Sequence, residues 1–122
     1  MSVVFTCPWY ATVFRGDAFA EALAEIAPVA LRYGASDYAV YRAGDDRYRF
    51  TQYATFESKD QFELYWHGEE FVAWRARYGS WYQVPVVYNA GSLVTAGRMG
   101  GEGNGNGGGG AAGSTARAEL AK

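Results

Sequence analysis

Cysteine and histidine are almost absent from this sequence of 122 residues, which contains one of each, Cys7 and His67. A single cysteine excludes an intramolecular disulfide, and in its apolar surroundings a small buried thiol is the expected role. A lone histidine without partner ligands gives no basis for a metal site. We therefore expect no bound metal ion.

Long runs of basic or apolar residues are also missing. Acids and bases are interspersed along the folded part and leave a net charge of −2, so we expect no nucleic acid partner. The opening residues lack the basic start of a signal peptide and are too few and too polar to span a bilayer, which takes about 20 apolar residues. These features predict a cytoplasmic protein without a membrane contact.

Glycine is distributed unevenly along the chain. Nine of the sixteen glycines follow Gly97, in a stretch without periodic apolar residues. This composition is typical of a flexible linker, so we predict one folded domain over residues 1–97 and a disordered tail over residues 98–122. The last nine residues, 114–122, favour a helix but are too few to hold one alone. They are either a solvated end or a peptide that docks on a partner protein.

The first third of the chain predicts a strand followed by a helix. Residues 3–14 are β-branched and aromatic, and Pro8 marks a bulge or an edge because proline cannot donate to a ladder. Asp17 is a suitable N-cap for a helix, with Pro28 as a kink and Gly34 as the end. Its buried stripe is expected to be Phe19, Leu23, Ile26, Ala30 and Tyr33.

The middle of the chain predicts a hairpin and then an interrupted helix. Residues 37–42 and 47–56 form two strands around the turn at residues 43–46. Ser58 opens a helix by a capping box, His67-Gly68 interrupts it, and residues 69–78 continue it. A last strand is predicted over residues 83–89, with a turn at residues 89–91 and a prolongation at residues 93–95.

This βαββαβ order predicts an α+β fold of the ferredoxin-like type, in which helices cover one face of an antiparallel sheet. The predicted strands are apolar on both sides and offer no clean polar face. A second copy of the chain would cover the face without helices, so we expect a homodimer.

The stretch RFTQYATFES, residues 49–58, with Phe62 four residues later, resembles the antibiotic biosynthesis monooxygenase family. The resemblance implies a dimeric α+β barrel and, in one branch, oxygenation of a phenol or anthrone without a cofactor. That branch carries an asparagine and a tryptophan at the positions of Gln52 and Phe56. Another branch degrades haem, but the position of its haem-binding histidine corresponds to Trp74, which disfavours haem degradation.

The same resemblance and the period of two along the third strand indicate the candidate site. Gln52 and His67 are the catalytic candidates. The walls for a small aromatic substrate would be Trp9, Tyr38, Phe50, Phe56, Trp66, Trp74 and Arg75.

Each candidate also has a structural explanation. A core with one hydrogen-bonded glutamine has the same pattern, and a histidine at a helix junction can cap exposed carbonyls. The tryptophans fit a helix face packed on the sheet, and Arg75 suits the last turn of a helix. Two functions therefore stay open: a cofactor-independent monooxygenase, or a dimeric binding or structural module without chemistry.

Overall fold

The computed structural model describes residues 2–99. The compact body ends at Ser92, and residues 93–99 belong to a separate unit in which these described residues form neither helix nor strand. The domain boundary at residue 97 stays a prediction. The predicted docking peptide, residues 114–122, and all but the first two residues of the predicted tail lie outside the described residues.

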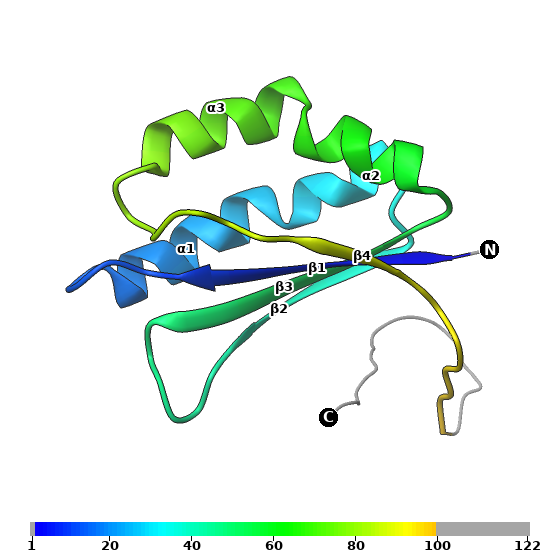
Figure 1. The fold of residues 1–122 in the computed structure, drawn as a ribbon, viewed down its shortest axis with the longest axis horizontal. Helices are drawn as coiled ribbons and strands as arrows, with labels where there is room; N and C mark the ends of the chain where they lie inside the picture. Colours follow the sequence, from blue (N-terminus) through cyan, green and yellow to red (C-terminus); the bar gives the residue numbers. More distant parts are fainter. Residues whose placement is uncertain (1, 100–122) are drawn as a thin grey trace. The chain divides into compact units, whose positions relative to one another are not determined.

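One antiparallel sheet carries all helices of the body on one face (Figure 1). Its spatial order is β2-β3-β1-β4, which is the ferredoxin-like arrangement and confirms the predicted α+β fold. The strands are β1 (Val3–Tyr10), β2 (Asp37–Arg42), β3 (Arg49–Phe56) and β4 (Asn89–Ser92). The helices are α1 (Gly16–Ile26), the 3₁₀-helix η1 (Pro28–Tyr33), α2 (Lys59–Trp66) and α3 (Glu69–Tyr78).

Strict alternation along the two central strands sets the core. On β3, Gln52 is buried together with Phe50, Ala54 and Phe56, whereas the residues between them are partly or fully exposed. Cys7 pairs with Gln52 in the β1–β3 register and is also buried. Because successive side chains of a strand point to opposite faces, these residues form the floor on which the helices pack.

The first helix differs from the prediction at both ends. Asp17 lies in the first turn of α1 rather than at its N-cap, which is Arg15. The carboxylate of Asp17 instead pairs with Arg42 of β2, at 2.9 Å. Pro28 does not kink the helix but begins the separate η1, since its missing N–H and fixed φ suit a first helical position. Gly34 ends η1 in the left-handed conformation, as predicted.

The helix break after Trp66 is confirmed. His67 is the C-cap of α2, and Gly68 begins the turn into α3. A Cβ on Gly68 would lie 2.6 Å from the Tyr33 hydroxyl and 2.7 Å from the Leu64 carbonyl oxygen. Only glycine fits this close approach of η1 and α2, so the interruption depends on packing as well as on helix propensity.

The last strand is shorter and later than predicted. Residues 83–88 are not a strand, and β4 covers the positions predicted as a turn, while residues 93–95 do not prolong it. Tyr82 forms an isolated bridge with Ala11, the residue after β1, and the chain joins β1 itself at the pair Thr6–Asn89. The two points are five residues apart on one side and seven on the other. Between these points lie Pro8 and Pro85, and neither can donate a ladder hydrogen bond.

Phe14 is the one described non-glycine residue with a left-handed backbone, at φ 69°. Its side chain is 91% exposed, so packing gains little from this conformation. The left-handed region costs an L-residue about 1–2 kcal/mol, and glycine costs about 0.5–1 kcal/mol in chain entropy. We expect Phe14→Gly to raise the free energy of unfolding by about 0.5–1 kcal/mol in urea titrations.

The matched control for this substitution is Val13→Gly. Val13 is also exposed, but its φ is not positive, so glycine should lower stability there. A loss of stability in Phe14→Gly that equals the loss in Val13→Gly would show that the turn is not strained.

Candidate functional site

A chain of three hydrogen bonds runs through the core around Gln52, which is 0% exposed. The Trp9 indole N–H donates to Gln52 Oε1 at 3.0 Å. Gln52 Nε2 donates to the Tyr65 hydroxyl at 3.0 Å, and this hydroxyl donates to the Ile26 carbonyl oxygen at 2.7 Å. Both ends of the carboxamide are therefore occupied by protein groups from β1 and α2.

Burial determines the protonation of the titratable groups beside this chain. Burial raises the pKa of Tyr65 well above its ordinary value, and the hydrogen bond from Gln52 opposes this shift only in part. Burial likewise raises the pKa of the Cys7 thiol, against a smaller opposing effect of Arg75. Both groups are neutral at pH 7, so Cys7 does not supply a thiolate nucleophile and Tyr65 does not supply a phenolate base.

The structure brings most of the predicted substrate walls together as packed rings. The Trp9 ring centroid lies 5.3 Å from that of Trp74 and 6.2 Å from that of Trp66. The Trp74 indole N–H donates to the Ala22 carbonyl oxygen at 2.7 Å. Phe50 and Phe56 complete this set, and all five residues are at most 8% exposed. They form the aromatic core under the helices.

Tyr38 and His67 do not join this cluster. Tyr38 lies on the edge strand β2 and is 40% exposed, and His67 is exposed at the end of α2. The His67 ring makes no hydrogen bond among residues 2–99. The carbonyl oxygen of Trp66, at the C-terminal end of α2, accepts a hydrogen bond from Arg75 Nη1 at 2.8 Å. A side chain therefore caps this helix, but the donor is Arg75 and not His67.

The arginine among the candidates, Arg75, is bound into the helix layer. Its guanidinium lies 4.2 Å from the Trp66 ring centroid and 5.0 Å from that of Phe71. With its hydrogen bond to the Trp66 carbonyl, this stacking ties α3 to the end of α2. A structural role accounts for these contacts.

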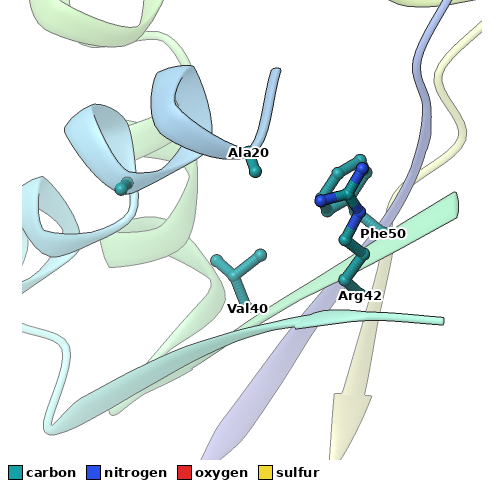
Figure 2. Close-up of a pocket in the computed structure, with 5 residues that line it drawn as sticks. Ala20, Val40, Arg42 and Phe50 are labelled. Carbon is teal, nitrogen blue, oxygen red and sulfur yellow. The ribbon is translucent and has the colours of Figure 1, made fainter. Parts of the chain in front are cut away.

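A hollow of about 240 Å³ opens between α1 and the sheet (Figure 2). Of the residues that line it, only Phe50 was among the predicted site residues. The lining residues are Ala20, Ala24, Val40, Arg42 and Phe50. Two features of the sequence could have indicated it: the alanines are four residues apart on one helix face, and Val40 and Arg42 share one face of β2.

The described residues contain no group of three or more histidine, cysteine or acidic side chains placed to hold a metal ion. In the same part of the chain, no helix is long and apolar enough to cross a membrane. The cytoplasmic location stays a prediction.

Comparison with solved structures identifies the fold. An antibiotic biosynthesis monooxygenase structure matches with a TM-score of 0.67 at 10% identity, over 78% of this chain and 100% of that chain. A protein of Nitrosomonas europaea, provisionally named as such an enzyme, matches with a TM-score of 0.70 at 17% identity, over 76% and 90% of the two chains. The chain has the antibiotic biosynthesis monooxygenase fold. No protein-family profile and no curated protein sequence matches it.

Another structure with this fold is SnoaB, a cofactor-independent oxygenase from Streptomyces nogalater. It matches with a TM-score of 0.67 at 14% identity, over 77% of this chain and 94% of that chain. The likeness confirms the resemblance predicted from residues 49–58 and the element order. At these identities it establishes the fold, while the function depends on the residues of the site.

Removing the central carboxamide should destabilise the body. In Gln52→Leu the Trp9 indole N–H loses its acceptor, whereas the Tyr65 hydroxyl still donates to Ile26. A buried unsatisfied donor costs about 1–3 kcal/mol, so we expect a loss of that size in urea titrations. Trp9→Phe removes the donor, and the double variant should lose less stability than the two single variants summed. Simple additivity would contradict the hydrogen bond.

Proposed function

We propose that the protein is a homodimeric binding module with the antibiotic biosynthesis monooxygenase fold, in which Gln52 serves the core instead of oxygen chemistry. The observation that carries this proposal is the closed hydrogen-bond chain from Trp9 to Ile26. Gln52 is fully buried and both ends of its amide are bonded.

The chemistry of cofactor-free oxygenation explains why this observation matters. A deprotonated phenol can itself reduce dioxygen, so the protein supplies a dry pocket, donors for the developing oxyanion and room for oxygen. The indole of Trp9 and the hydroxyl of Tyr65 are donors of the right kind, but both already donate to protein oxygens. His67, the candidate base, is exposed and makes no bond to this chain. These contacts argue against oxygen chemistry at Gln52.

A second candidate is a cofactor-independent monooxygenase that acts on a small phenol or anthrone. The fold likeness to SnoaB favours it. In such a reaction the phenolate reduces dioxygen, a hydroperoxide forms on a ring carbon, and loss of water leaves a quinone. For Gln52 to act on a substrate, with His67 at the pocket mouth, the aromatic core would have to open around that substrate.

Oxygen consumption separates the two candidates. We expect an oxygen electrode to record the same rate with native and with denatured protein, for a panel of phenols, hydroquinones and anthrones. The reason is that the Trp9 indole N–H and the Tyr65 hydroxyl already donate to protein oxygens and are not available to a developing oxyanion. Uptake that exceeds the denatured control, and that falls in Gln52→Ala, would establish the oxygenase instead.

The face of the sheet without helices supports the homodimer. Its side chains come from the alternate positions of the central strands and of β2, and they include tyrosines that are partly exposed. Tyr41 and Tyr53 are 52% and 37% exposed, and their rings meet edge to face at 5.6 Å. Thr6, Thr51 and Thr55 share this face, so it is more polar than the sequence analysis predicted. Exposed tyrosines are typical of interface cores.

A charge on this face should separate the two copies. We expect native protein at micromolar concentration to have the mass of a dimer in light scattering and Tyr53→Glu to have the mass of a monomer, because a buried unpaired carboxylate is costly. Leu64→Glu is the matched control, since Leu64 is 64% exposed on α2, in the helix layer. A native monomer, or a dimer that survives in Tyr53→Glu but not in Leu64→Glu, would exclude the sheet face as the interface.

A further inference from the structure

We propose that the hollow between α1 and β2 binds a carboxylate that carries a single aromatic ring, with Arg42 as the partner of the carboxylate. This inference rests on the proposed binding function and names its ligand. The hollow is separate from the polar chain of Gln52, because its five lining residues include none of the members of that chain.

The walls of the hollow suit a flat apolar group. Ala20 and Ala24 line the hollow from α1 with methyl groups only. Figure 2 shows Ala20 on the helix, with Val40 and the Phe50 ring on the side of the sheet. Small-molecule sites commonly enclose roughly 300–1,000 Å³, so about 240 Å³ favours a ligand of one ring over a fused system.

The Arg42 guanidinium is held in place at the edge of this apolar surface. Its Nε donates to the Arg47 carbonyl oxygen at 2.7 Å, and its Cζ lies 5.1 Å from the centroid of the Phe50 ring. A Cβ on Gly16 would lie 2.8 Å from Nη2, so the glycine leaves room for the group. The Arg42 side chain is only 19% exposed, which limits its screening by water.

The donors of Arg42 determine the class of ligand. Asp17 Oδ1 contacts Nη1 at 2.9 Å, whereas Nη2 makes no hydrogen bond within residues 2–99. A guanidinium binds a carboxylate with two parallel hydrogen bonds, and a carboxylate is ionised at pH 7 whereas a simple phenol is not. The side chain of Asp17 is 92% exposed and can therefore yield its place to a ligand.

Titration calorimetry with sodium benzoate tests this inference. Benzoate should bind native protein at least about tenfold more tightly than benzyl alcohol, which lacks the charge, and than acetate, which lacks the ring. Ala24→Leu should abolish binding because it fills the hollow, whereas Ala73→Leu on the exposed side of α3 should not change it. Binding that is absent, or that is unchanged in Ala24→Leu, would overturn the proposed site.

Charge variants test the role of Arg42. Arg42→Gln should weaken benzoate binding by about tenfold or more, and Arg49→Gln, which removes an exposed arginine of β3, should leave it unchanged. Asp17→Asn removes the competing carboxylate and should tighten binding several-fold, without a large effect on the fold. Weaker binding in Asp17→Asn would overturn the assignment. This variant also keeps the test valid if Arg42→Gln fails to fold.

Oxygen consumption in the same samples keeps the two proposals distinguishable. Oxygen uptake with phenols would refute the binding module. The benzoate site would still stand if calorimetry shows that Ala24→Leu blocks the binding of benzoate. If benzoate does not bind and no oxygen is consumed, the proposed ligand is refuted, whereas the proposal of a module without catalysis stands.

Discussion

The hydrogen bond between the Trp9 indole and Gln52 is the constraint on which the interior depends. In a low-dielectric core an unpaired carboxamide is costly, and here both of its ends are bonded. The bond fixes the indole plane between the sheet and the helices, where it contacts the rings of Phe19, Phe71, Trp74 and Tyr82. Because Tyr65 continues the chain to Ile26, the same network ties β3, α2 and the end of α1 together.

The fold and the residues of the interior give different indications of function. The chain has the fold of a known cofactor-independent oxygenase, yet Trp9, Gln52 and Tyr65 in its interior are bonded to one another. Phe50 also lines the hollow, where small side chains on α1 leave space and Arg42 supplies a charge. A protein can keep a superfold and place its ligand site elsewhere, because only the local residues decide the chemistry.

Much of the fold could be predicted from local chemistry in the sequence. Alternation on residues 49–56 gave the correct buried face, and Ser58 accepts from the Gln61 N–H at 3.3 Å as the capping pattern indicates. The misses have tertiary causes. Asp17 bonds to Arg42 across the fold instead of capping α1. Residues 83–89 were predicted as a strand, but the strand begins only at Asn89, because neither Pro8 nor Pro85 can donate a ladder hydrogen bond. The hollow depends on packing between α1 and β2, which one sequence does not specify.

The closed interior is tested most directly by hydrogen exchange of the Trp9 indole N–H, observed by NMR and assigned with Trp9→Phe. The account predicts that this proton exchanges only when the whole body unfolds, so that its exchange free energy equals the free energy of unfolding. Added phenols should not shift its resonance. Exchange that is much faster than global unfolding, together with a resonance that moves on addition of a phenol, would contradict a closed core and show that Trp9 and Gln52 face a ligand.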